Sequence, residues 1–402
     1  MIAAIPLSLL LAGTATSQST VSNTQVQAGD VFSSQTLDVV TASSDTTATT
    51  TATGNSFVGS VVSGGVTVTS SQTVSGALQA QTVLNVASDA GPSTTLTTAA
   101  TGNSGDSVIS GGGTLAGNYT QTSTSATIDA ESSIAGPNAQ TADAAVAVQA
   151  IGNSQGFGST DSTIATTTTQ SNSATVTANG GAILGDIPDQ ASFSAVGNGN
   201  NVTSVGAGAS TQTLAVNQTN TGAVTQGTMF VNLGNSEVTS TNATATGNNL
   251  NATNTEGALS VGVGQDNQSY VRAQAVETSF AFGGANVSAY GVGNSVMAGN
   301  IGPSTALNNV QTNGPAGVQS IASFSGDNGF DAFVSSTATG NAATGFACSA
   351  CGGVINVGNT QTNLGDIGAT GSVTLTNGAR SVRSTVTAVG NTGSFYVSSP
   401  GQ

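Results

Sequence analysis

The sequence predicts an all-β protein wound as a right- or left-handed β-solenoid (β-helix), and three observations support this prediction. The dipeptide Gly-Asn returns at a nearly fixed interval, in seven steps from Asn55 to Asn391, a mean of 48 residues. A glutamine recurs in phase with it, 28 to 32 residues ahead of each asparagine. Thr and Val are abundant, and apolar residues at helical spacing are absent. A repeat of this length is typical of solenoids and related arrays.

The two markers define about eight imperfect repeats. The recurring pairs are Gly54-Asn55, Gly102-Asn103, Gly152-Asn153, Gly197-Asn198, Gly247-Asn248, Gly293-Asn294, Gly340-Asn341 and Gly390-Asn391. The recurring glutamines are Gln25, Gln72, Gln121, Gln170, Gln218, Gln265, Gln311 and Gln361. Two extra pairs, Gly234-Asn235 and Gly358-Asn359, lie out of phase and suggest a half-repeat. We therefore predict two coils of about 24 residues in each repeat, and a rod of roughly sixteen coils near 75 Å long.

Residues before each Gly-Asn pair alternate in character, which indicates a strand with one buried face. Val146, Val148 and Ala150 lead to Gly152 on one face, while Ser and Thr occupy most of the other face in the repeats. Successive residues of a strand point to opposite sides, so the small apolar set predicts a narrow core. Abundant β-branched residues argue against disorder of the whole chain.

The Gly-Asn pair suits a corner of the coil, because glycine adopts positive φ without steric cost and asparagine tolerates it next best. Stacked repeats would then place the asparagines in a column, and two interpretations are open: a plain turn, or a buried ladder of side-chain amides. Gln72 shares strand parity with Val68 and Val74, which predicts a second amide column that faces inward.

Residues 1–17 are predicted to be a signal peptide, and residues 18–402 a single repetitive β-solenoid. The apolar run Leu7-Ser8-Leu9-Leu10-Leu11 is followed by small residues suited to cleavage near Ala15 or Ser17, and is too short to span a membrane as a helix. No other stretch approaches the length of a membrane helix. The protein is therefore expected to be exported, without a direct membrane span.

Composition excludes several functional classes. The formal net charge is −15, with three Arg and no Lys, so binding to nucleic acid or an anionic membrane surface is not expected. The chain has no His, which excludes a Ser-His-Asp triad and an imidazole metal site. Its acids, one or two to a repeat, form no cluster in the sequence. We expect no enzyme activity, cofactor or metal, and keep a polysaccharide-modifying β-helix enzyme as a distant alternative.

Cys348 and Cys351 are the two cysteines of the chain. In an exported protein a Cys-x-x-Cys pair is typically a short disulfide that staples a loop, and this is the hypothesis we favour. A redox motif is the alternative, although no alternation of strands and helices surrounds the pair.

The recurring short sequence patterns of the chain resemble those of a known family. Thr-x-Ala-x-Gly-Asn-Ser stretches recur along its length, together with Thr-Gln-Thr segments such as Thr120-Gln121-Thr122, Thr211-Gln212-Thr213 and Thr360-Gln361-Thr362. With the export signal and the size, these features resemble the holdfast-anchor protein of stalked bacteria, of the HfaD type. The spaced Gln and Asn are also similar, more weakly, to those of curli-type amyloid subunits, whose period is about half as long.

The resemblance implies a protein of the cell surface and outer membrane that tethers an adhesive polysaccharide. It also implies two partners, an outer-membrane lipoprotein and a small amyloid-like subunit, with self-association as a further possibility. Our first functional hypothesis is therefore an exported structural protein that anchors an adhesive polysaccharide (holdfast) or adhesin to the outer envelope. The alternative is a subunit of an extracellular amyloid-like fibre.

Overall fold

The computed structural model describes residues 7–12, 18–348 and 352–398, and within these ranges the chain forms strands and connecting turns without a helix. The strands are β1 (Leu7–Ala12), β2 (Gln18–Gln27), β3 (Val31–Thr41), β4 (Thr46–Val62), β5 (Gly65–Val74), β6 (Leu78–Asp89), β7 (Ser93–Ser110), β8 (Thr114–Ser123), β9 (Thr127–Gln140), β10 (Asp143–Thr160), β11 (Thr163–Asn172), β12 (Thr175–Ala207), β13 (Thr211–Asn220), β14 (Val224–Asn254), β15 (Ala258–Asn267), β16 (Tyr270–Asn300), β17 (Ser304–Asn313), β18 (Val318–Cys348), β19 (Val354–Asn363), β20 (Ile367–Asn377) and β21 (Ser381–Ser398).

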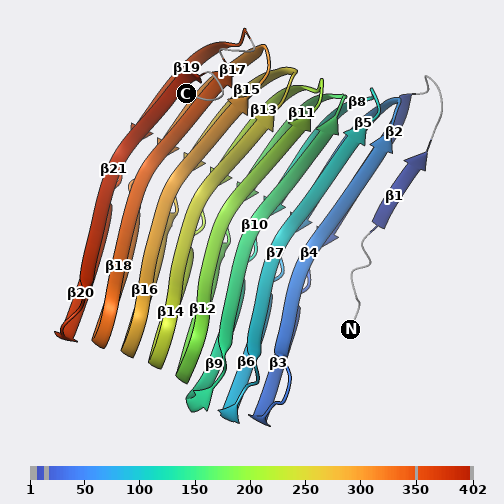
Figure 1. Cartoon of the computed structure of the whole chain (residues 1–402). Helices are drawn as coiled ribbons and strands as arrows, with labels where there is room; N and C mark the ends of the chain where they lie inside the picture. Colours follow the sequence, from blue (N-terminus) through green and yellow to red (C-terminus); the bar gives the residue numbers. More distant parts are fainter. Residues whose placement is uncertain (1–6, 13–17, 349–351, 399–402) are drawn as a thin grey trace.

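These strands wind into eight coils stacked in chain order, which Figure 1 shows as a series from blue to red. Each coil has three faces. The first is a ten-residue strand such as β2 or β11, and these strands form one parallel sheet of eight. The second and third faces are separate strands in coils 1 to 3 and in coil 8. In coils 4 to 7 they are the two halves of one long strand, namely β12, β14, β16 or β18.

Every named strand pair is parallel, and partners lie one repeat apart. Gln25 pairs with Gln72, and Asn55 pairs with Asn103. The prediction of a β-solenoid built from eight repeats is confirmed. The prediction of two coils in each repeat is wrong, because three faces of about ten residues or more use the whole repeat for one turn. At about 4.8 Å for each step, the first and last of the eight coils lie roughly 34 Å apart, about half the predicted length.

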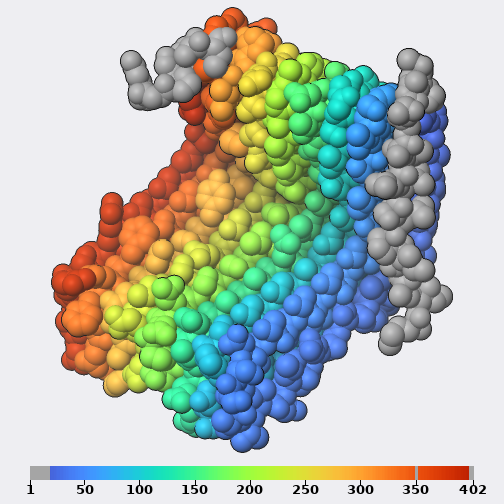
Figure 2. Space-filling model, turned by 45° about the vertical axis from the view of Figure 1, so that its right-hand side comes forward, coloured from blue at the N-terminus to red at the C-terminus, as the bar shows by residue number. Residues whose placement is uncertain are grey.

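The core lies between the three faces and is filled in thin layers. Alternate residues of each strand are buried, as for Val146, Val148 and Ala150 in β10. Two hydrophobic clusters fill the space between the second and third faces, and a third cluster lies between the third face and the eight-stranded sheet. In the space-filling view the coils cross the surface as parallel bands (Figure 2).

The segment predicted as a signal peptide is described only in part. Its residues Leu7–Ala12 form β1, which pairs in parallel with residues 57–62 of β4. Residues 1–6 and 13–17 lie outside the described ranges, so the cleavage site stays a prediction. Within the described residues, no helix has the length and apolar character needed to cross a membrane.

Candidate functional site

The eight Gly-Asn pairs lie inside strands, on the third face of each coil. None of their glycines has positive φ, so the prediction of a corner that needs positive φ is wrong. The strand instead shifts its alternation at the pair: Gly102 and Asn103 both face inward, as do Gly247 and Asn248. Adjacent coils make the same shift, so the register between them is kept through the pair.

Glycine is required at these positions because neighbouring coils approach closely. A Cβ on Gly247 would lie 2.3 Å from Oδ1 of Asn267 and 2.4 Å from the carbonyl oxygen of Gly293. A Cβ on Gly54 would lie 2.6 Å from the carbonyl oxygen of Gly102. These distances are shorter than van der Waals contact, so a larger residue would push two coils apart.

The asparagines that follow these glycines form a continuous ladder, which we call the first asparagine column. Each of the first seven donates from Nδ2 to Oδ1 of the asparagine in the next coil, over 2.7 to 2.8 Å. In the first seven coils the second Nδ2 hydrogen is donated to a backbone carbonyl of the eight-stranded sheet. The members are Asn55, Asn103, Asn153, Asn200, Asn248, Asn294, Asn341 and Asn391.

The predicted member Asn198 is not part of this column. Coil 4 contains Gly-Asn twice in succession, and the register pairs Asn153 with Asn200, whereas Asn198 pairs with Ile151. Asn200 is fully buried and Asn198 is half-buried. Gly199, rather than Gly197, therefore occupies the glycine position of the column in this coil.

All eight predicted glutamines lie in a second ladder, the glutamine column. Each glutamine after Gln25 donates from Nε2 to Oε1 of the glutamine in the preceding coil, over 2.7 to 2.9 Å. The remaining Nε2 hydrogen is donated to the carbonyl of the residue that follows the Gly-Asn pair of the same coil, as from Gln72 to Ser104 and from Gln218 to Asn249. Both amide hydrogens thus have partners, as buried amides require.

The two columns tie the same two faces together from opposite sides. Asn103 donates to the carbonyl of Thr122 on the eight-stranded sheet, and Gln72 donates to the carbonyl of Ser104 on the third face. The asparagines donate toward the following coil, whereas the glutamines donate toward the preceding coil. Each coil is therefore cross-linked internally and to both neighbours by side-chain hydrogen bonds.

A third ladder, the second asparagine column, was missed by the sequence reasoning. Its members donate from Nδ2 to the asparagine of the next coil over 2.8 to 3.0 Å. The signal was present as a Gln-x-Asn motif in five consecutive repeats. The members are Asn172, Asn220, Asn267, Asn313 and Asn363.

One carboxyl group is buried among the apolar residues. Glu277 of β16 is fully buried, and its two oxygens accept hydrogen bonds from the hydroxyls of Thr239 and Thr241 at 2.5 and 2.7 Å. Burial raises the pKa of Glu277 above its ordinary value, and the two hydroxyl donors oppose this shift only in part. The group is enclosed, which does not suit a surface catalytic acid.

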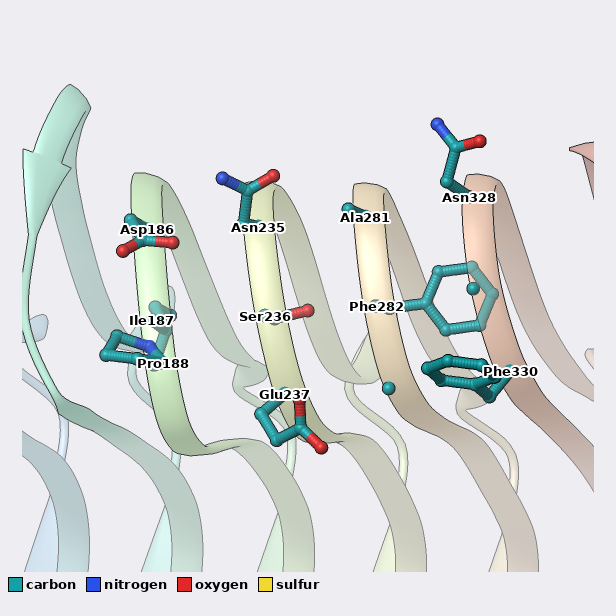
Figure 3. Close-up of a pocket in the computed structure, with 12 residues that line it drawn as sticks. Asp186, Ile187, Pro188, Asn235, Ser236, Glu237, Ala281, Phe282, Asn328 and Phe330 are labelled. Atoms are coloured by element: carbon teal, nitrogen blue, oxygen red, sulfur yellow. The ribbon is translucent and has the colours of Figure 1, made fainter.

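The corner between the second and third faces carries two hollows that open to solvent. One has a volume of about 520 Å³ and is lined by coils 4 to 7, and another of about 480 Å³ is lined by coils 1 to 4. They share Pro188, and we call them together the corner groove. Figure 3 shows the part in coils 4 to 7, where equivalent residues of adjacent coils lie in rows.

Polar side chains form one rim of the corner groove. The register aligns Asp89, Gln140, Asp186 and Asn235 in successive coils. Gln140 donates to Asp89 at 3.1 Å, and the backbone N–H of Gly91 donates to the same carboxylate at 2.8 Å. Both bonds lower the pKa of Asp89, and the bond from the Gly91 backbone has the larger effect. This rim is therefore an array of carboxylates and amides.

The floor and the other rim are more apolar. Ile187 and Phe282 are buried beneath the groove, and Phe282 packs edge-on against Phe324 with ring centroids 4.8 Å apart. Glu237, Gly283 and Phe330 occupy equivalent positions in coils 5 to 7, because the residues immediately before and after them are register partners. The side chain of Phe330 is 59% exposed.

The predicted cysteine pair is described only at one end. Cys348 is buried at the end of β18, while Cys351 lies outside the described residues. The disulfide therefore stays a prediction. In the described part of the chain, no three His, Cys, Asp or Glu side chains gather in a way that could hold a metal ion.

Comparison with known families adds the deciding observation. The family model of holdfast attachment protein D matches residues 40–316, which is more than half of the chain. The chain belongs to the holdfast attachment protein D family. No curated protein and no solved structure matches it. The resemblance inferred from the sequence is thus confirmed.

The match to holdfast attachment protein D covers most of the solenoid described above. It begins within β3 and ends within the turn after β17, so it includes the long strands β12, β14 and β16 and most members of both asparagine columns. The family is one of holdfast attachment proteins, which favours a structural role on the cell surface over an enzymatic one.

Proposed function

We propose that this protein is an exported structural protein of the cell surface and outer membrane that anchors an adhesive polysaccharide, the holdfast, to the outer envelope. The match to holdfast attachment protein D carries the proposal. The fold supports it, since every outward position is repeated by its register partner about 4.8 Å away in the next coil. Weak contacts to a repeating polymer would add up along such an array.

The amide columns suit this role because an anchor must keep its shape while its ligand is pulled. The first asparagine column and the glutamine column connect all eight coils, and their hydrogen bonds are largely shielded from water. Separating two coils would break several of these bonds together with the parallel backbone ladder. We assign the Gly-Asn and Gln residues this structural role and no catalytic or cofactor-binding one.

Two partners complete the proposal. An outer-membrane lipoprotein would hold the solenoid at the cell surface, and a small amyloid-like subunit would connect it to the polysaccharide. Self-association of the solenoid is compatible with both. The low positive charge of the chain gives no support to nucleic acid as a partner.

Deletion of the gene tests the function. We expect cells without the protein to synthesise the adhesive polysaccharide and shed it into the medium, which lectin staining of cells and supernatant would measure. Removal of whole coils should weaken retention gradually. The proposal fails if deletion abolishes polysaccharide synthesis, or if retention and adhesion are unchanged.

A further inference from the structure

We propose that copies of this chain meet end to end, with coil 8 of one copy stacked on coil 1 of the next copy in the same orientation. The two surfaces are the first-coil end, formed by β2, β3 and β4, and the last-coil end, formed by β19, β20 and β21. Figure 1 shows them at opposite ends of the stack. This inference rests on the proposed function, with which self-association is compatible, and deepens it by naming the surfaces that meet and their direction.

Both ends carry strand edges that can accept a further strand. Within the described residues, β19, β20 and β21 pair on one side only, and so do β2 and β3. The outer edge of β4 is occupied over residues 57–62 by β1, which lies in parallel. Because β1 belongs to the predicted signal peptide, the mature chain would lack it. Its position shows that this edge accepts a parallel strand, as unpaired edges do.

The apolar core is open at both ends, and the two ends match in layout. Coil 1 has strands of 10, 11 and 17 residues, and coil 8 has strands of 10, 11 and 18. When Gln361 and Asn391 are aligned with Gln25 and Asn55, four partly buried apolar residues of coil 8 meet four of coil 1. The pairs are Val357 with Val21, Ile367 with Val31, Val373 with Leu37, and Leu375 with Val39. Stacking would bury these residues as the inner coils bury theirs.

The amide columns end in complementary groups. In the described part of the chain, no further asparagine accepts from Nδ2 of Asn391, and no further glutamine donates to Oε1 of Gln361. At the other end, Asn55 lacks an asparagine that donates to its Oδ1, and Gln25 lacks a glutamine that accepts from its Nε2. Stacking lets Asn391 donate to Asn55 and Gln25 donate to Gln361. Two like ends would instead set donor against donor or acceptor against acceptor.

Aromatic rings and glycines also complement each other across the junction. Within the chain, Phe57 of coil 1 already faces Gly105 of coil 2. The alignment places Phe57 against Gly393 of the neighbouring copy, and Phe395 of that copy against Gly59. A Cβ on Gly59 would meet no atom closer than 3.5 Å, and Phe57 and Gly59 both line an apolar hollow of coils 1 to 3. Each large side chain therefore meets a position without one.

Charge is opposite at the two ends. Coil 1 has three acids and no basic residue, namely Asp30, Asp38 and Asp45. Coil 8 has two of the three arginines of the chain and a single acid. The alignment sets Arg383 opposite Thr47, beside Asp45. Unlike ends therefore attract each other, whereas two first-coil ends repel.

Such a contact joins two different surfaces, so it leaves one free end on every assembly and does not stop at a dimer. Each junction would add a step of about 4.8 Å, the same as within the chain. The rows of outward residues would therefore continue from one copy to the next, which lengthens the array available to a polymer.

Cysteine cross-linking of the protein without its predicted signal peptide, residues 18–402, tests the contact. Thr20 and Asn356 are exposed and become partners across the junction. In a background with Cys348→Ser and Cys351→Ser, Thr20→Cys with Asn356→Cys in one chain should form a ladder of dimers, trimers and longer species on oxidation, seen by non-reducing denaturing electrophoresis. The control Thr167→Cys, exposed in the middle of the same sheet, reports side-by-side contact and should stay monomeric.

Matched variants locate the surfaces by sedimentation velocity. Gly59→Phe has space for its Cβ in the free protein but occupies the place of Phe395 from the next copy, so it should raise the Kd of association at least about tenfold. The control Thr167→Phe should change the Kd by less than about twofold. Arg383→Asp should raise the Kd about threefold, and Asp45→Arg added to it should restore association. Unchanged urea midpoints would show that the variants fold.

Three outcomes would overturn the inference: a monomeric protein at the highest concentration measured; Thr167→Cys cross-linking as readily as the junction pair, which would mean side-by-side contact; or Gly59→Phe associating like the wild type. These assays contain no polysaccharide, so their failure is separate from that of the proposed function. If the protein stays monomeric while deletion of its gene sheds the polysaccharide, the anchor stands and the stacking does not.

Discussion

Coils 1 to 3 and coils 4 to 8 solve the same packing problem in two ways. Two residues after each glutamine, the first three coils place Gln27, Val74 and Ser123, whereas the last five place asparagines that form the second asparagine column. The glycine of the Gly-Asn pair contacts this position in both regions: an added Cβ would lie 2.9 Å from a methyl of Val74 at Gly54, and 2.3 Å from Asn267 at Gly247.

Comparing the two regions separates what every coil requires from what is required only where residues form a column. Glycine is needed in both regions, because the carbonyl of the next coil approaches it closely whichever residue lies behind it. The adjoining position is an amide paired along its column in coils 4 to 8, and a residue outside any ladder in coils 1 to 3. A buried amide needs amide neighbours, since an unpaired buried amide is costly, whereas valine has no side-chain hydrogen bond to lose.

The largest expected effect distinguishes a whole coil from half a coil. Deletion of residues 163–210 removes one turn and joins Ser162 to Thr211, the register partner of Thr163. This variant should fold and unfold cooperatively. Deletion of residues 163–186 removes half a turn and places inward residues on the wrong face, so we expect no cooperative transition by circular dichroism. Similar melting of both variants would contradict one coil per repeat.

The next effect concerns the two adjacent Gly-Asn pairs of coil 4. Asn200→Ala removes three buried hydrogen bonds, to Asn153, Asn248 and the carbonyl of Thr219, and should lower the free energy of unfolding by about 3 kcal/mol or more. The matched control Asn198→Ala lies outside the column and should cost less than about 0.5 kcal/mol. Urea denaturation measures both, and equal costs would refute the assignment of the column.

Exchange of residues between the two regions tests the column rule. Asn220→Val alone leaves a donor of Asn172 and an acceptor of Asn267 without a partner, so we expect a loss of about 2 kcal/mol. Val74→Asn should cost a similar amount, because its register partners Gln27 and Ser123 belong to no amide ladder. Replacing all five members of the second asparagine column with valine should cost less for each residue than Asn220→Val does. Strict additivity would show that the positions are independent.

The smallest effect is a pH dependence of the free energy of unfolding that originates from Glu277, which is buried between coils 5 and 6. Its folded-state pKa is raised, so the folded protein retains a proton that the unfolded chain loses above about 4.5. Stability should therefore fall by up to about 1.4 kcal/mol for each pH unit above that value, and level off above the folded-state pKa. Glu277→Gln should remove this slope in urea midpoints measured across the range, and an unchanged slope would exclude Glu277 as its cause.

The sequence predicted the period, the strands and the glutamine column, because those features repeat in every coil. It did not predict the number of coils in a repeat, since a spacing gives the period but not the turns within it. The spacing does not distinguish Asn198 from Asn200, because two Gly-Asn pairs follow one another there, and only the register between coils shows that Asn200 belongs to the column. The second asparagine column was readable as Gln-x-Asn in five repeats.

The corner groove could not have been found in the sequence. Asp186, Glu237 and Phe330 are separated by more than forty residues at each step and belong to no motif. They lie along one corner only because one repeat makes one turn. Glu237 and Phe330 occupy the same register position in coils 5 and 7, and Asp186 of coil 4 is in register with Asn235, two residues before Glu237. Irregular residues at a corner carry no periodic signal, although their positions are set by the periodic part of the chain.

The central claim is that residues one repeat apart are neighbours on the surface, and a disulfide cross-link tests it most directly. Thr167 and Ala215 are exposed register partners on adjacent strands of the eight-stranded sheet. Their Cα atoms, about 4.8 Å apart, lie within the range of roughly 4.4 to 6.8 Å that a disulfide spans. In a background with Cys348→Ser and Cys351→Ser, we predict that Thr167→Cys with Ala215→Cys cross-links on oxidation, as mass spectrometry would show. The account would be contradicted if this pair stayed reduced and the pair Thr167→Cys with Ser192→Cys, half a repeat apart, formed the cross-link.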